Sequence, residues 1–371
     1  MNLENGTLED WLKNPPADAK YKKGGDTYPF YSKYDNFKDY LNKNVHNETT
    51  KGAIIAEIKE NKDFDKVTWL NDHGPEHIKT VIQRASLLVE SKDCELNPRE
   101  VFILLNSIQI HDVGNFFGRH NHEKKIIETI KDGLSPAVFD RKEVKLIKDI
   151  AQVHGGSYKE ENGVKNKNTF KSIISPTSNS DSYVIRLHLL ASILRFADEL
   201  ADDKNRADIK SLKEKKMPKG SEIYHAYALC LEPPIVNHEE RRIELHYYIN
   251  KEDLYSNFGK YDNESDTIIE KTVLEEIYER TLKIHYERIY CSKYWKKNID
   301  IESIWVKIEF YSDLYEDIHP EITYTLTDSE YPNKEGLTIF DLCKKELSYP
   351  DGQLITTENV IKKIEENEKS I

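Results

Sequence analysis

The spacing of apolar residues constrains the fold of this 371-residue chain more than any other feature of its sequence. From residue 51 to about 215, apolar side chains recur three and four positions apart, which places them on one face of a helix. The clearest examples are Ile78, Val81, Ile82, Ala85 and Leu88 in one segment and Leu187, Leu190, Ala191 and Leu194 in another. This periodicity predicts a helical body over 51–215, interrupted by a Gly- and Asn-rich loop over 154–170.

The pattern differs on both sides of this helical body. Residues 1–50 are rich in Tyr, Lys, Asn and Gly, and we expect a loop-rich N-terminal segment that packs on the main body. Residues 216–371 alternate between apolar and polar positions, which is typical of strands. We expect strands at 226–234 (AYALCLEPP), 241–250, 303–313 and 321–328, and helices at 272–290 and 359–371. The sequence therefore predicts a mainly α protein with a smaller α+β region after the helical body.

Composition excludes several classes of protein. The net charge of −12 gives no general attraction to a polyphosphate backbone, so duplex nucleic acid is disfavoured as a partner. No apolar run approaches the roughly 18 residues of a membrane-spanning helix, and we expect a cytoplasmic protein. The four cysteines, Cys94, Cys230, Cys291 and Cys343, are far apart in the sequence and form no CxxC pair. We therefore expect reduced thiols rather than disulfides or a cysteine-bound zinc ion.

A cluster of histidines stands out in the helical body. The stretch 108–125 (IQIHDVGNFFGRHNHEKK) carries three histidines and an aspartate directly after an apolar run. Their places on the predicted helices matter more than their number. His77 opens one helix, His111 and Asp112 end the next, and Asp198 lies on the apolar stripe of a third. These positions direct four polar side chains toward the interior.

Asp198 in particular requires a positively charged neighbour. An ionised carboxylate on an apolar helix face costs several kcal/mol unless it is paired or bound to a cation. Arg195, three residues earlier, is the structural candidate because it can pair across one helical turn. The functional candidate is a metal ion, with His77, His111 and Asp112 completing a mixed nitrogen and oxygen ligand set.

The ordered set of histidines and aspartates resembles the HD-domain superfamily of metal-dependent phosphohydrolases. The residues that carry this resemblance are His77, His111, Asp112, His122, His154 and Asp198. It covers about 65–210, and LRFADELAD at 194–202 is similar to the LRxADxLD helix of that superfamily. The whole chain looks like the HD-CE subgroup, which is associated with bacterial stress or conflict proteins. The resemblance implies an HD-type helical core.

The resemblance also implies a metal centre. Members of the superfamily hold one or two divalent ions, here Mn, Fe, Ni or Zn, with Mg also possible, and the aspartate of the HD pair bridges two ions. By this analogy Asp112 is both a metal ligand and a catalytic residue, and His122 and His154 are ligands of the second ion. Two ions lower the pKa of a bound water and stabilise the displaced oxygen of a phosphoryl transfer. We therefore expect a metal-dependent phosphohydrolase.

A second resemblance competes for the same stretch. The deoxynucleoside triphosphate triphosphohydrolases of this superfamily show a pattern close to HDIGxxPFGHxGE, which aligns His120 and Glu123 with residues that act at the phosphate chain. This chain lacks the proline of that pattern and has Gly-Arg in place of Phe-Gly. In this alignment His120 and Glu123 are catalytic, whereas in the first alignment His122 binds a metal and His120 is peripheral. The sequence leaves both alignments open.

Several neighbouring side chains are candidates for binding a phosphorylated substrate. They are His73, Arg84, Arg119 and Lys124, for which a helix cap or a solvated helix face is the structural alternative. We expect hydrolysis of a nucleotide or a similar small phosphorylated substrate. The alternatives are a single-strand nuclease, a cyclic-nucleotide phosphodiesterase, or a non-catalytic sensor or interaction module with a structural metal. A protein partner or a second copy of the chain would then bind through the C-terminal region.

Overall fold

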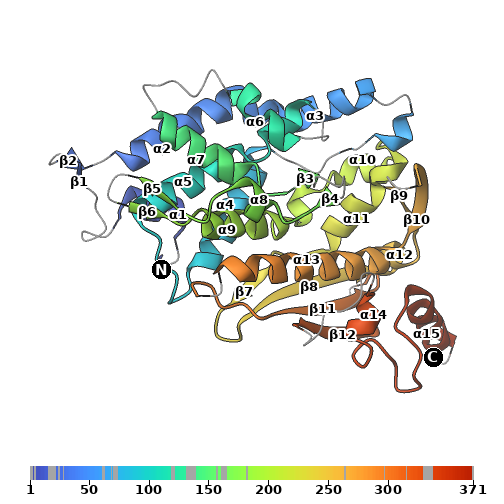
Figure 1. The fold of residues 1–371 in the computed structure, drawn as a ribbon. Helices are drawn as coiled ribbons and strands as arrows, with labels where there is room; N and C mark the ends of the chain where they lie inside the picture. The colour runs from blue at the N-terminus through green and yellow to red at the C-terminus, as the bar shows by residue number, and fades with distance from the viewer. Residues whose placement is uncertain are drawn as a thin grey trace. The chain divides into compact units, whose positions relative to one another are not determined.

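The computed structural model divides the chain into two compact units, each assembled from separate stretches of sequence. The first contains residues 1–60, 72–201 and 291–300, and the second contains 61–71, 202–290 and 301–371. The model describes residues 3, 6–15, 22–23, 26–27, 29–60, 63–67, 69, 74–117, 122–130, 139–155, 158–159, 165–180, 183–262, 265–295, 297–314, 316–328 and 337–369. The first unit is helical and the second combines helices with a sheet, which confirms the predicted fold class (Figure 1).

The first unit consists mainly of helices. Its helices are α1 (Leu8–Lys13), α2 (Phe30–Leu41), the π-helix η1 (Asn42–His46), α3 (Asn47–Glu60), α4 (Pro75–Val89), α5 (Pro98–Ile110), the 3-10 helix η3 (Val113–Phe117), α6 (His122–Ile130), α7 (Arg141–Ala151), α8 (Thr169–Ile173) and α9 (Leu187–Glu199). Its strand pairs are β1 (Lys22–Lys23) with β2 (Asp26–Thr27), β3 (Tyr158–Lys159) with β4 (Lys165–Asn166), and β5 (Ser178–Ser180) with β6 (Tyr183–Ile185). The predicted apolar stripes of α4 and α9 are buried, which confirms both helices. None of the helices that the model describes is both long and apolar enough to cross a membrane.

Helix α5 is the centre of the first unit, because all 13 of its residues are buried and α2, α4, α7 and α9 pack around it. The chain begins α5 with Pro98 at its first turn and a capping box in which Glu100 reaches back to the cap backbone. Glu100 has no exposed surface and also forms an ion pair with Arg186 over 2.7 Å. The negative charge of Glu100 in the first turn of α5 is therefore paired with a positive charge within the first unit.

The structure differs from the expectation of a loop-rich N-terminal segment over 1–50. Helices α1 and α2 and the π-helix η1 lie in this region, together with the start of α3. Phe30, Tyr34, Phe37 and Leu41 are buried at helical spacing on α2, which packs against α5. The many Tyr, Asn and Lys residues between them hid this stripe in the sequence. Burial against α5, rather than local propensity, stabilises the helix.

The predicted loop at 154–170 also contains regular structure. Where the model describes this stretch, it includes the two-residue strands β3 and β4 and the start of α8. The short antiparallel pairing of Tyr158 with Asn166 is too brief to give a periodic signal in the sequence.

The second unit contains a four-stranded sheet and its own helices. Its helical segments are η2 (Phe64–Lys66), η4 (Lys204–Arg206), α10 (Ile209–Lys213), η5 (Lys219–Ser221), α11 (Glu222–Cys230), α12 (Lys251–Leu254), α14 (Ile339–Leu342), α15 (Thr357–Lys369) and most of α13 (Val273–Trp295), whose residues from 291 onward belong to the first unit. The sheet has the order β12 (Asp317–Thr327), β11 (Ser303–Tyr311), β8 (Arg242–Asn250) and β7 (Ile235–Asn237), and β9 (Phe258–Asp262) pairs separately with β10 (Thr267–Lys271). Strands β8 and β11 are parallel, and the long connection between them contains α13. Thr281 on α13 contacts the Tyr324 hydroxyl on β12 over 2.8 Å, so this helix packs on the sheet (Figure 1).

Most of the predicted elements of this region are confirmed, but the prediction of a strand at 226–234 is wrong. Its first half lies in α11, and only Leu231 makes a bridge, to Tyr247. The run is apolar on both faces, and such a short run fits a buried strand and a buried helix equally well. Its two alanines favour the helix.

Candidate metal centre

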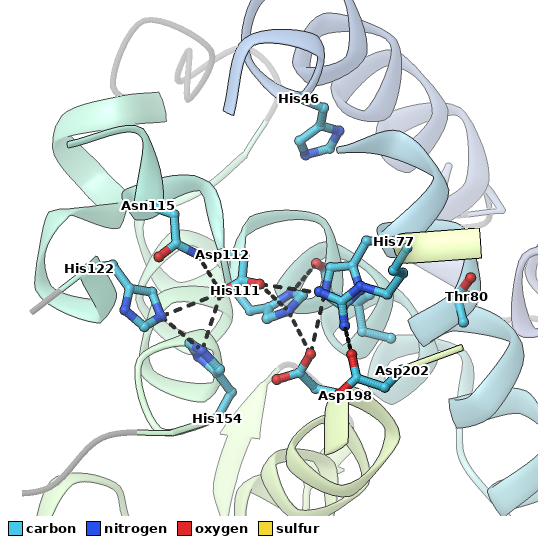
Figure 2. Close-up of polar contacts among 12 residues, drawn as sticks. His46, His77, Thr80, His111, Asp112, Asn115, His122, His154, Asp198 and Asp202 are labelled. Carbon is cyan, nitrogen blue, oxygen red and sulfur yellow. Dashed lines mark hydrogen bonds and ion pairs between the residues drawn. The ribbon is translucent and has the colours of Figure 1, made fainter. Parts of the chain in front are cut away.

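Five helices or helix ends of the first unit bring six side chains together. They are His77 in the first turn of α4, His111 and Asp112 at the end of α5, His122 at the start of α6, His154 three residues past α7, and Asp198 near the end of α9 (Figure 2). The sequence predicted these six residues as metal ligands. They form two groups that share Asp112.

The first group contains His77, His111, Asp112 and Asp198. The Nε2 atom of His77 lies 3.4 Å from Asp112 Oδ2 and 3.3 Å from Asp198 Oδ1. The Nε2 atom of His111 lies 3.4 Å from each of the same two oxygens. Donor atoms bound at about 2.1 Å to one ion, at angles of 90° to 109°, lie roughly 3.0 to 3.4 Å apart. The spacing therefore fits one divalent ion at the centre of the group.

His111 shows most directly that the first group fits a cation. Its Nδ1 lies 2.8 Å from the Ile108 carbonyl oxygen, so Nδ1 carries a proton and Nε2 faces the two carboxylates. This Nε2 atom is buried and makes no hydrogen bond within the described part of the chain. Burial lowers the pKa of His111, but the charges of Asp112 and Asp198 outweigh it and hold that pKa well above its ordinary value. The two carboxylates thus favour a positive charge at this point, either a proton or a metal ion.

The second group contains Asp112, His122 and His154. Asp112 Oδ1 lies 3.4 Å from His122 Nε2 and 3.6 Å from His154 Nε2, and the two Nε2 atoms are 3.2 Å apart. Nδ1 of His154 donates to the Ala151 carbonyl over 2.6 Å, which directs the lone pair of Nε2 toward the group. Because Oδ2 faces the first group and Oδ1 faces the second, the Asp112 carboxylate has the arrangement of a ligand that bridges two ions.

Gly114 allows His122 to approach Asp112 closely. A Cβ atom at Gly114 would lie 1.9 Å from the main-chain oxygen of His122, far inside van der Waals contact. Only glycine permits η3 and the start of α6 to pack at this distance. The glycine of the HDVG stretch therefore has a steric role in forming the second group.

Two buried side chains near the centre were missed from the sequence. Asn115 donates from Nδ2 to Asp112 Oδ1 over 2.9 Å and has no exposed surface. Its position one turn after Asp112 in the HDVGN stretch was the available signal. His46 on η1 contacts the Gln109 carbonyl oxygen through Nε2 over 2.7 Å, two residues before His111. No local pattern connects residue 46 with this helix end.

Among the described residues, the predicted residues Arg84 and Arg195 are not part of the two groups. Arg84 is buried and donates from Nε to the Leu200 carbonyl over 3.2 Å, so in this structure it contacts the end of α9. Arg195, the structural alternative for pairing with Asp198, donates to Thr169 Oγ1 over 3.4 Å. The residues His73, Arg119 and His120 and the side chains of Glu123 and Lys124 lie outside the described residues. Their proposed contacts with substrate stay predictions.

The chain is similar to a known protein family over more than half of its length. The family model described as HD-CE matches residues 64–269, which is more than half of the chain and includes all six residues of the two groups. No curated protein and no solved structure matches the chain.

Proposed function

The chain belongs to the HD-CE family, and from this membership we propose that it is a metal-dependent phosphohydrolase. The observation that carries the proposal is the division of the Asp112 carboxylate between two groups of imidazole and carboxylate donors. A structural ion needs only one such group. Two adjacent groups that share one carboxylate are the arrangement used for hydrolysis of phosphoesters and phosphoanhydrides.

The residues of the centre suit divalent ions. Divalent ions held by these residues would supply Lewis acidity and lower the pKa of a coordinated water. His77 and His111 offer imidazole nitrogen donors to the first group, and His122 and His154 offer them to the second. The mixture of imidazole and carboxylate favours Mn, Fe, Ni or Zn, whereas Mg prefers oxygen ligands alone.

The exposure of the ligands supports a small substrate. The side chains of His77 and His111 have no exposed surface, whereas Asp198 keeps 26% and His122 keeps 14%. Solvent therefore reaches the centre beside Asp198 and His122, and we expect a substrate to approach it there. The limited exposure suits a phosphate group better than a duplex, and the net charge of −12 also disfavours long polyanions. We propose a nucleotide or a similar small phosphoester as substrate.

Two finer assignments belong to this proposal. A triphosphohydrolase reaction would use His120 as an acid or a phosphate donor and Glu123 to orient it. A second copy of the chain or another protein would bind through the C-terminal region. Both rest on the sequence resemblance.

The proposal is tested by elemental analysis of the purified protein, followed by hydrolysis assays on a nucleotide panel with Mn²⁺. We expect bound transition metal and release of phosphate or a phosphorylated product, and both should be lost in Asp112→Ala. The matched control is Asp149→Ala, which removes an aspartate that pairs with Lys145 on α7. A protein that binds metal but hydrolyses no member of the panel would instead be a binding module with a structural metal.

A further inference from the structure

We infer that Asn115 is a positioning residue that fixes the Asp112 carboxylate between the two ligand groups and thereby sets the metal affinity of the second group. This inference rests on the metal centre of the proposed function. It concerns the second group, Asp112 with His122 and His154, more than the first.

Asn115 contacts Asp112 twice. The main-chain N–H of Asn115 donates to the Asp112 carbonyl over 2.9 Å, and its side-chain Nδ2 donates to Asp112 Oδ1 over the same distance. The last torsion of an aspartate side chain is broad, so the carboxylate plane turns easily unless a neighbour holds it. The side-chain hydrogen bond holds it with Oδ2 toward His77 and His111 and with Oδ1 toward His122 and His154 (Figure 2).

The two groups depend on this hydrogen bond to different degrees. The first group has two carboxylate oxygens, Asp112 Oδ2 and Asp198 Oδ1, and both face its histidines. Among the described side chains, the second group has a single carboxylate oxygen, Asp112 Oδ1, which also accepts the hydrogen bond from Asn115. A divalent ion is held more strongly where more negative charge faces it. The second group is therefore the weaker site and the more sensitive to the orientation of Asp112.

The amide oxygen of Asn115 provides a second, independent observation. A carboxylate can only accept hydrogen bonds, so the amide nitrogen must face Asp112 and the amide oxygen must point away from it. That Oδ1 atom is buried and has no hydrogen-bond partner among the residues that the model describes. Figure 2 shows it turned away from Asp112, on the side where His122 lies. This oxygen offers an acceptor to a water beside the second group.

The inference is tested by calorimetric titration of the metal-free protein with Mn²⁺, together with elemental analysis of the loaded protein. Asn115→Leu keeps the approximate volume and removes both the donor and the acceptor. We expect the affinity of the weaker site to fall by about 10- to 100-fold, the usual effect of losing a hydrogen-bond partner of a ligand. The tighter site should be much less affected. Asn115→Ser, which keeps a hydroxyl donor, should show a smaller loss.

Asn106→Leu is the matched control. Asn106 is also fully buried, donates from Nδ2 to the Phe102 carbonyl over 2.7 Å, and leaves its Oδ1 without a partner in the described chain. It lies on α5 but outside both ligand groups. Replacing it removes the same chemical groups without touching Asp112, so both metal affinities should stay at the wild-type values. An equal loss in the Asn106 and Asn115 variants would show a general packing effect and overturn the inference.

Thermal unfolding of each metal-free variant separates folding from binding. If Asn115→Leu does not fold, Asn115→Ser and Asn115→Ala carry the same test. Unchanged affinity of the weaker site in these variants would overturn the inference, as would a wild-type protein that binds a single ion. Neither result would contradict a metal-dependent phosphohydrolase. Conversely, a wild-type protein without hydrolytic activity but with a weaker site that depends on Asn115 would contradict only the proposed function.

Discussion

Arg84 donates a hydrogen bond from Nε to the main-chain carbonyl of Leu200 over 3.2 Å. Leu200 follows the last residue of α9 and lies two residues after the metal-ligand candidate Asp198. The last carbonyls of a helix lack partners within the helix, and a cationic donor at this end is favourable. The guanidinium group therefore stabilises the helix end that positions Asp198.

The first prediction concerns this contact. Arg84→Met keeps most of the apolar stem and removes the donor, so the free energy of unfolding should fall by about 1 to 3 kcal/mol. Urea unfolding measures this change, and Arg141→Met, at an exposed position that begins α7, is the control. A variant with unchanged stability and a raised KM would instead support the sequence-based assignment of Arg84 to substrate binding.

The two aspartates of the centre should have different effects. Asp112→Ala removes the oxygen donors of both groups, so bound metal and hydrolysis should both be lost. Asp198→Asn removes charge from the first group alone and nearly keeps the side-chain volume. It should lower the affinity for one ion by more than the roughly 10- to 100-fold that follows from loss of a hydrogen-bond partner of a ligand. Elemental analysis and hydrolysis assays check both variants, and full activity in both would contradict the assigned centre.

Alanine variants separate the two alignments of the GRHNHE stretch. His122→Ala and His154→Ala should each reduce the metal content from about two ions toward one, because each removes one of the three ligands of the second group. His120→Ala should leave the metal content unchanged. If His120 acts as a positioned acid or base, its loss should lower the rate by about 10² to 10⁴-fold. Metal content and hydrolysis measured on the same three proteins decide between the alignments. Unchanged metal content in both the His122 and His154 variants would reject the second ion.

Gly114→Ala should damage the second group selectively. The added Cβ would overlap the main-chain oxygen of His122, so α6 must move and carry His122 away from Asp112. We expect loss of the weaker metal site, with the tighter site kept, in a calorimetric titration with Mn²⁺. Gly155→Ala is the control, because a Cβ there would meet nothing within 4 Å although Gly155 adjoins a ligand. Two intact sites in Gly114→Ala would show that the close packing is not required.

A pH prediction follows from His46. Burial is the main reason that the pKa of His46 is lowered from 6.5 to about 4. The hydrogen bond to the Gln109 carbonyl raises this pKa, whereas the nearby His111 and His77 lower it further. Between about pH 4 and pH 6.5, His46 binds a proton in the unfolded chain but not in the folded chain. The free energy of unfolding therefore rises with pH over this range. His46 alone should cost up to about 3 kcal/mol as the pH falls from 6.5 to 4. Urea unfolding across this range should show a smaller slope for His46→Gln, and an equal slope would contradict the buried neutral imidazole.

The sequence predicted the helices of the centre and the six side chains that the structure brings together because their signals are local. The apolar stripes of α4 and α9 lie within single elements, and the predicted ligand residues stand at or near the ends of elements. The order of histidines and aspartates then carried the family resemblance. The HD-CE match supports that resemblance, whereas the likeness to triphosphohydrolases rests on residues that the structure does not describe.

What the sequence could not predict depends on contacts between distant segments. Helix α2 is stabilised by burial against α5, and its composition alone favoured a loop. The apolar run in α11 is compatible with a strand until its neighbours are known. His46 lies 63 residues from Gln109, its partner in the core. The roles of Gly114 and Asn115 likewise became visible only with the placement of His122 and Asp112.

The assignment of residues 291–300 to the first unit has a consequence for synthesis of the protein. Trp295 is fully buried and packs edge-on against Phe196 on α9, with ring centroids 5.1 Å apart. The ribosome adds about 5 to 20 residues per second, so this tryptophan emerges on the order of ten seconds after the last ligand, Asp198. Until then the nascent chain lacks the tryptophan that packs on Phe196, and we expect the apolar surface there to attract chaperones. A gene fragment that ends at the predicted boundary, residue 215, would leave this surface exposed permanently and should yield aggregated protein.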